Sequence, residues 1–110
     1  MDLLKKKLGE NSKESNYYQR GIEDYNINDY NSSVLNFLRF ISISIDNNDI
    51  ALAFLNCGFI YFRLGKYNSS ISYFSKAIRL EEKIGILINR SKSISYRGRC
   101  EAKYKSGDFK

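Results

Sequence analysis

Residues 58–74, GFIYFRLGKYNSSISYF, decide the fold of this 110-residue chain because the pattern occurs twice. Residues 21–37, GIEDYNINDYNSSVLNF, contain the same Tyr-Asn-Ser-Ser sequence, followed by an aliphatic residue and, three positions later, by Phe. The two stretches are offset by 37 residues throughout. Self-similarity at a fixed period of this kind is the signature of a repeat architecture, so we expect a fold built from stacked units.

A third copy of the unit begins near Tyr96. In this copy Gly107 and Phe109 correspond to Gly65 and Tyr67 of the second unit, at an offset of 42 residues. The third copy stops partway through the unit. We therefore expect an N-terminal basic, amphipathic segment followed by a repeat domain, with boundaries at about 1–13, 14–50, 51–92 and an incomplete unit at 93–110.

Each unit is predicted to form two helices joined by a tight turn, because small and apolar residues recur at helical spacing on both sides of the turn. In the second unit these residues are Phe54, Cys57, Gly58 and Tyr61 before the turn, and Ile71, Phe74, Ala77 and Ile78 after it. Asp49 is the expected N-cap of the first helix, and Gly65 is expected to reverse the chain. Gly58 and Ala77 leave room for close approach of the two helices, which predicts an antiparallel hairpin.

The segment FISISI at residues 40–45 alternates apolar and polar side chains, which on local evidence is typical of a β-strand. One repeat later the equivalent residues 77–83, AIRLEEK, have high helix propensity. An isolated strand would also leave its backbone groups without partners. We therefore expect a helix here and an all-α fold, with antiparallel helix–turn–helix repeats stacked as a short right-handed solenoid.

The composition argues against catalysis. The chain contains no His and only two cysteines, Cys57 and Cys100, so the commonest general base and the commonest zinc ligand are missing. Both cysteines fall in apolar periodic stretches without a CxxC spacing, and we interpret them as reduced core residues. The sequence predicts that the chain is not an enzyme and holds no cofactor or metal.

The N-terminal residues 1–8, MDLLKKKL, lack the apolar run of a signal peptide, and no segment approaches the roughly 18 apolar residues of a membrane span. We therefore expect a cytoplasmic protein with no membrane contact. The net charge of +6 is concentrated in residues 83–110, which hold eight basic and two acidic side chains. This stretch could contact phosphates, but it has no nucleic-acid-binding motif, so nucleic acid is the least favoured partner.

These units resemble the tetratricopeptide repeat, a helix–turn–helix of 34 residues. In the second unit the resemblance rests on Phe54-x-x-Cys57-Gly58-x-x-Tyr61, Gly65-x-Tyr67 and Ser70-x-x-x-Phe74-x-x-Ala77. The first unit matches less closely, because Asp24 stands where Tyr is expected and Phe40 where Ala is expected. The offsets look like the longer variant of the repeat found in some signalling scaffolds. The resemblance implies a scaffold that binds a protein or peptide.

In this family the first helices of the units line a concave groove, and the resemblance implies which side chains face it. They are Tyr18, Ile22, Tyr25 and Asn26 in the first unit, Leu52, Leu55, Phe59, Phe62 and Arg63 in the second, and Ile94, Arg97, Glu101, Tyr104 and Lys105 in the third. We expect the groove to accept the apolar face of a partner helix or an extended peptide, with Arg97 and Lys105 favouring an acidic end.

The best-known ligand of this family is the C-terminal carboxylate of chaperones, which a Lys-Asn-Asn-Lys-Arg clamp holds. Only Asn56 matches the clamp, and it completes the predicted groove. Tyr18, Ile22, Ile94 and Gly98 occupy the other clamp positions. We therefore do not expect this chain to capture a chaperone tail.

The alternative to an open groove is self-association. A first helix that is apolar on all sides, as residues 51–62 are, is often buried by neighbouring structure, here the N-terminal segment or a second copy of the chain. The incomplete third unit also leaves Tyr96, Cys100 and Tyr104 without their usual cover. Either the natural chain continues past Lys110, or the last helix pairs with a second copy as a homodimer.

Overall fold

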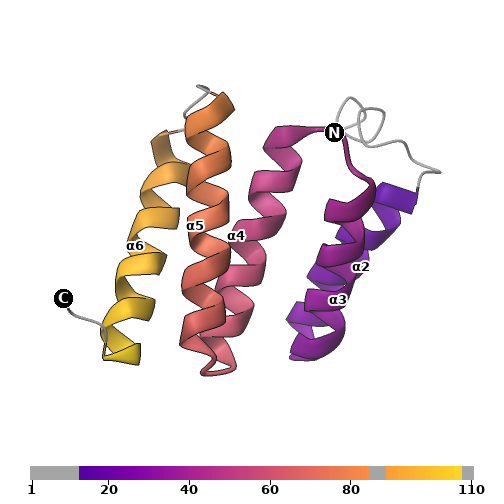
Figure 1. The fold of residues 1–110 in the computed structure, drawn as a ribbon. Helices are drawn as coiled ribbons and strands as arrows, with labels where there is room; N and C mark the ends of the chain where they lie inside the picture. Colours follow the sequence, from indigo (N-terminus) through magenta and orange to yellow (C-terminus); the bar gives the residue numbers. More distant parts are fainter. Residues whose placement is uncertain (1–12, 85–88, 108–110) are drawn as a thin grey trace.

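The computed structural model describes residues 13–84 and 89–107, and these residues form five α-helices and no strand. The helices are α2 (Lys13–Asn26), α3 (Tyr30–Ile43), α4 (Asn47–Arg63), α5 (Tyr67–Ile84) and α6 (Asn89–Ser106). Hairpin α2–α3 lies beside hairpin α4–α5, and α6 packs against α5 at the other end of the row (Figure 1). The all-α helical-repeat fold expected from the sequence is confirmed.

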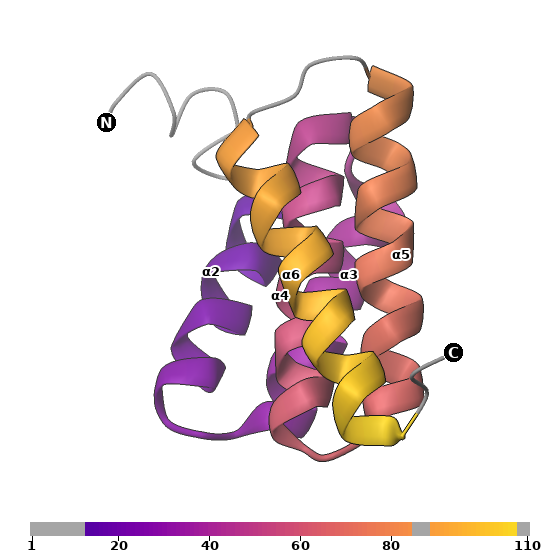
Figure 2. The same ribbon diagram turned by 90° about the vertical axis from the view of Figure 1, so that its left-hand side faces the viewer.

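The two faces of the helical array are formed by different helices. In Figure 2 helix α2 lies on one side and α5 on the opposite side. Helix α4 contacts α3, α5 and α6, which makes it the most enclosed helix of the array. None of the helices in the described part of the chain is long and apolar enough to cross a membrane. The predicted N-terminal segment lies almost wholly outside the described residues, as does Phe109.

The turns within the units repeat one backbone conformation. Asn28, Gly65 and Gly107 have φ of 65°, 75° and 84°, in the left-handed region, and they are separated by the offsets of the sequence repeat. A residue in this conformation commonly ends a helix, and Gly or Asn adopts it at the lowest cost. The third backbone match shows that α6 corresponds to α2 and α4, the first helices of their units.

Aspartates cap two of the helices: Asp29 caps α3 directly after the Asn28 turn, and Asp46 caps α4 after the loop between the first two units. The Asp29 side chain accepts a hydrogen bond from Ser32 N at 3.3 Å at the start of α3. The Asp46 side chain accepts from Asn48 N at 2.9 Å and from Asp49 N at 3.3 Å at the start of α4. The prediction that Asp49 is the N-cap was wrong, because Asp46 supplies the acceptor earlier and places Asp49 in the first turn.

The two helices of the second unit approach each other most closely at one contact, which we call the Gly–Phe–Ser contact. A Cβ atom on Gly58 would lie 2.8 Å from the ring of Phe74, so only glycine fits here without a shift. The Ser70 hydroxyl donates to the Gly58 carbonyl oxygen at 2.8 Å. Phe74 and Ser70 are both fully buried. The close approach predicted at Gly58 is confirmed.

The first unit repeats the Gly–Phe–Ser contact at the equivalent residues. A Cβ atom on Gly21 would lie 2.9 Å from the Phe37 ring, and the Ser33 hydroxyl donates to the Gly21 carbonyl oxygen at 2.6 Å. The weaker sequence match of this unit does not loosen it, because Asp24, the mismatched residue, accepts a hydrogen bond from Asn36 Nδ2 at 2.8 Å.

The alternating segment 40–45 is mainly helical. Helix α3 continues to Ile43, and Ser44 at the C-cap is extended. Phe40 is fully buried, with its ring 5.0 Å from that of Tyr18. Burial of this side chain against α2 outweighs the local preference for a strand. The helix predicted by comparison with residues 77–83 is therefore confirmed as far as Ile43.

The two cysteines differ in exposure. Cys57 is fully buried, as predicted, whereas Cys100 is exposed. The prediction of a buried Cys100 was wrong. Helix α6 buries Ser95, Gly98 and Ala102 against its neighbours, and Cys100 lies on the other side, which no later helix covers within the described residues.

We predict that Gly58→Ala lowers the free energy of unfolding by up to about 2 kcal/mol, because overpacking against Phe74 outweighs the gain in helix propensity. In a Phe74→Leu background the clash is relieved and the propensity gain remains, so the same substitution should become neutral or stabilising. Urea denaturation of the four proteins measures this double-mutant cycle. Additive effects of the two substitutions would contradict the contact.

We predict that a thiol reagent labels one cysteine per native chain rapidly. Burial raises the pKa of Cys57 to about 12, so its thiol stays protonated and inaccessible, whereas Cys100 is exposed. Mass spectrometry of briefly labelled protein measures the stoichiometry. Cys100→Ser should abolish the fast reaction, and denaturant should expose the remaining thiol; rapid native labelling of Cys57 would contradict the packing of α4.

Candidate functional site

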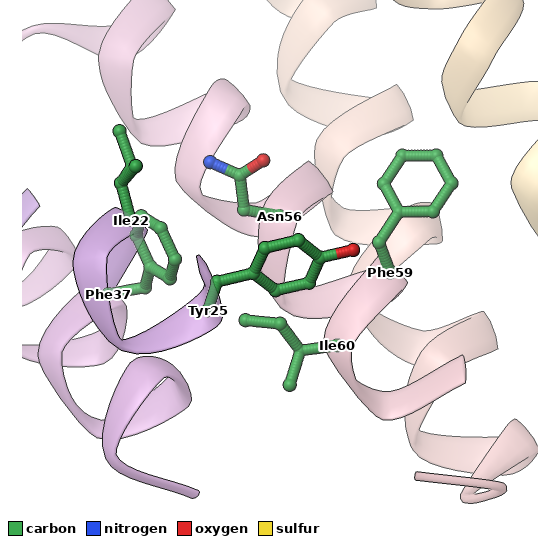
Figure 3. A pocket seen from close by; sticks show the side chains of 6 residues that line it. All are labelled: Ile22, Tyr25, Phe37, Asn56, Phe59 and Ile60. Atoms are coloured by element: carbon green, nitrogen blue, oxygen red, sulfur yellow. The ribbon is translucent and has the colours of Figure 1, made fainter. Parts of the chain in front are cut away.

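A pocket of about 170 Å³ opens between α2 and α4 (Figure 3). We call it the groove pocket. It is lined by Ile22, Tyr25, Phe37, Asn56, Phe59 and Ile60. Phe37 and Ile60 are 2% and 1% exposed and form the floor, while Ile22 is 36% exposed. In Figure 3 the ring of Tyr25 reaches from α2 toward Phe59 and Ile60 of α4. The pocket is therefore apolar at its base and accessible at its rim.

Two hydrogen bonds join α2 to α4 beside the groove pocket. Asn56 Nδ2 donates to the Tyr18 hydroxyl at 3.1 Å, and Arg63 Nε donates to the Tyr25 hydroxyl at 2.7 Å. The Arg63 guanidinium carbon also lies 5.8 Å from the centre of the Tyr25 ring. The partners on each helix are about two turns apart, so the bonds form two parallel braces that fix the distance between the helices.

The groove pocket is largely uncharged. Burial raises the pKa of the Tyr18 phenol above its ordinary value, and the hydrogen bond with Asn56 lowers it in part. Tyr18 therefore stays protonated at neutral pH and accepts the amide hydrogen bond as a neutral group. Arg63 is exposed and supplies a positive charge beside the pocket. This arrangement suits an apolar side chain with a negative group next to it.

The structure gathers six of the predicted groove residues around this pocket: Tyr18, Ile22, Tyr25, Asn56, Phe59 and Arg63. Leu52, at 36% exposure, lies one turn before Asn56 on α4. Asn26 is exposed at the end of α2. The α2–α4 part of the predicted groove thus exists as a surface with a hollow.

Other predicted groove residues lie elsewhere. Leu55 is 7% exposed and packs with Phe74 and Ala77, so its assignment to an open groove was wrong. Its burial follows from the packing of α6 against α4, which the sequence of α4 alone does not specify. The Phe62 ring packs edge-on against Tyr67 at 5.3 Å, toward the start of α5.

The residues of α6 do not line the groove pocket. Ile94 packs against the core cluster that contains Leu55. Arg97 and Glu101 are exposed, and Tyr104 is 68% exposed. Lys105 lines a different hollow, formed with residues 65–69 and Ser106 at the turn between α4 and α5. An acidic end bound by Lys105 would therefore not share the groove pocket.

Sequence reasoning missed two residues of the floor, Phe37 and Ile60. Phe37 belongs to a second helix, and only the first helices were expected to line the groove. Ile60 is two residues after Gly58, on a face of α4 that is otherwise core. Floor residues of this kind carry no pattern that separates them from other buried apolar residues.

Within the described ranges, no group of three or more Cys, Asp or Glu side chains is placed to hold a metal ion. What the structure provides is a stack of helical hairpins with an apolar pocket between two of them, which is the arrangement of a helical-repeat protein.

Comparison with known families identifies the repeat. Residues 51–84 match the model of the tetratricopeptide repeat, so the resemblance expected from the sequence is confirmed and the hairpin α4–α5 is a tetratricopeptide repeat. Such repeats are generally protein–protein interaction modules, in a family of non-enzymatic scaffolds. No curated protein matches the chain, and no solved structure matches it.

Proposed function

We propose that the chain binds a protein partner through the surface formed by α2 and α4, and that one apolar side chain of a peptide or helix enters the groove pocket. The pocket itself carries this proposal. An apolar cavity of about 150 Å³ in another protein takes up benzene, so a hollow of this size accommodates one aromatic or branched aliphatic side chain. Exposed apolar residues at the rim, Ile22 and Leu52, extend the contact.

The polar groups around the groove pocket favour a particular neighbour for that side chain. Arg63 stands beside the pocket with its Nε already bonded to Tyr25, and the remaining guanidinium nitrogens can donate to a carboxylate. Asn56 donates through Nδ2 to Tyr18, which leaves its carbonyl oxygen to accept from a backbone N–H of the partner. A segment with an apolar residue followed or preceded by Asp or Glu fits these groups.

We predict that peptides selected from a random library on this protein contain such a segment and depend on the groove pocket. Ile22→Lys should weaken their binding at least about tenfold, because it places a charge at an apolar rim. The matched control is Leu35→Lys, which changes a 49% exposed leucine on α3. Fluorescence anisotropy with labelled peptides measures both. Equal affinity for the wild type and Ile22→Lys would reject the pocket as the binding site.

A second candidate function is self-association through α6. Tyr96, Cys100 and Tyr104 are all exposed along one side of α6, with Tyr104 at 68% and Tyr96 at 37%. If this side of α6 paired with the same side of a second copy, a symmetric dimer would bury it, and such dimers are the commonest oligomers. Burial of two tyrosine rings per chain would then supply much of the interface.

We predict that changing both Tyr96 and Tyr104 to Lys weakens any self-association, which sedimentation equilibrium measures at one fixed concentration. Tyr96 also donates to Glu82 at 2.6 Å. The control is therefore Tyr96→Phe, which removes that hydrogen bond, keeps the ring and should associate like the wild type. A wild-type chain that remains monomeric at sub-millimolar concentration would rule out the dimer.

A further inference from the structure

A third hollow, of about 250 Å³, lies along α5. Helix α5 is on the side of the molecule opposite to α2 (Figure 2). We call this third hollow the basic hollow. It is lined by Phe54, Lys76, Arg79, Leu80 and Lys83. It shares no residue with the groove pocket, so the function proposed above does not account for it.

Three cations surround the basic hollow. Lys76, Arg79 and Lys83 follow one another at i, i+3 and i+7 along one face of α5, and all three are exposed. Like charges at these spacings repel each other on a helix. Neither carboxylate of α5 lines the hollow: Glu81 is buried, and Glu82 accepts a hydrogen bond from Tyr96 of α6. An anionic partner would relieve the repulsion.

The floor of the basic hollow is apolar and its rim is ordered. Phe54 and Leu80 are partly buried, and the Phe54 ring packs 6.1 Å from that of Tyr73. The ammonium group of Lys76 lies 4.7 Å from the centre of the Tyr73 ring and 5.9 Å from that of Phe54. These cation–π contacts hold Lys76 over the aromatic pair, at the edge of the hollow.

We propose that the basic hollow is a second protein-binding site, which takes an acidic segment of a partner with one apolar side chain set between carboxylates. The charge complementarity requires the carboxylates, and the apolar floor between the cations requires the apolar side chain. A hollow suits an inserted side chain, whereas binding to a membrane surface calls for apolar groups that protrude among the cations. With the groove pocket on the α2 side, the chain would contact partners on two opposite faces.

The test uses the peptide acetyl-Gly-Glu-Glu-Leu-Phe-Glu-Glu-Gly-amide and the whole chain, observed by two-dimensional NMR. We expect saturable shifts of the Phe54 ring signals and of the amides of residues 76–83. Arg79→Glu should weaken this binding about tenfold, because it reverses a central charge. The matched control is Arg39→Glu, which reverses an exposed arginine of α3 that lines neither the groove pocket nor the basic hollow and should leave these shifts unchanged.

Two further peptides separate the charge from the apolar contact. Replacing the Leu-Phe pair by Gly-Gly should remove the shifts of the Phe54 ring, and replacing all Glu by Lys should abolish binding. Arg79→Gln, which removes the charge without reversing it, should show an intermediate affinity. Circular dichroism of each variant checks that the helices are retained.

Other outcomes would overturn this second site. Shifts confined to Ile22 and Phe59 would place the acidic peptide in the groove pocket and leave the proposed function intact. A single-stranded oligonucleotide that shifts residues 76–83 more strongly than the acidic peptide would assign the cations to phosphate binding. Conversely, loss of acidic-peptide binding on Arg79→Glu without any effect of Ile22→Lys is the result expected for two independent sites, and it supports the basic hollow.

Discussion

The ring of Phe74 holds three helices together, and the rest of the array depends on it. It is fully buried on α5, and Cβ atoms placed on Gly58 of α4 or on Gly98 of α6 would lie 2.8 and 2.5 Å from it. Two glycines on different helices thus pack against one aromatic side chain. Close packing of this kind leaves no alternative side chain on either helix without a rearrangement. The position of α6, and with it the burial of Leu55, follows from this arrangement.

The groove pocket follows from a difference at the same structural position. Asn56 of α4 corresponds to Gly98 of α6, 42 residues later, and Phe37 of α3 corresponds to Phe74 of α5. Glycine lets α6 close directly on Phe74, whereas the Asn56 side chain occupies the equivalent space next to Phe37 and bonds to Tyr18. Helix α3 packs directly on α4, but α2 and α4 are joined by side-chain braces with a hollow between them, whereas α6 packs directly against α5 and α4. The side chain of Asn56, where the third unit has Gly98, therefore accounts for the hollow between α2 and α4.

Local patterns in the sequence predicted the contacts within a unit much better than those between units. The glycine and aromatic positions of each hairpin, the left-handed turn residues and the helical state of residues 40–43 all follow from spacing and from comparison of the copies. Leu55 and Cys100 were misplaced because their exposure depends on which helix stacks against α4 and α6, and apolar periodicity does not contain that information. The pocket floor was missed for the same reason, since Phe37 and Ile60 become a surface only where two hairpins meet. The N-cap of α4 was misplaced because two aspartates, at positions 46 and 49, both have the right chemistry.

Each helix in this array packs chiefly against helices that precede or follow it closely in the chain. Few distant segments must therefore find each other during folding, and the entropy lost in closing loops is small. Either hairpin can form first from its own Gly–Phe–Ser contact and then serve as a template for its neighbour. The junction between the first two hairpins, where α3 packs on α4 but a hollow separates α2 from α4, is then the place where the native chain opens most readily. A partner that fills the hollow at this junction would slow that opening and make the two hairpins unfold as one cooperative body.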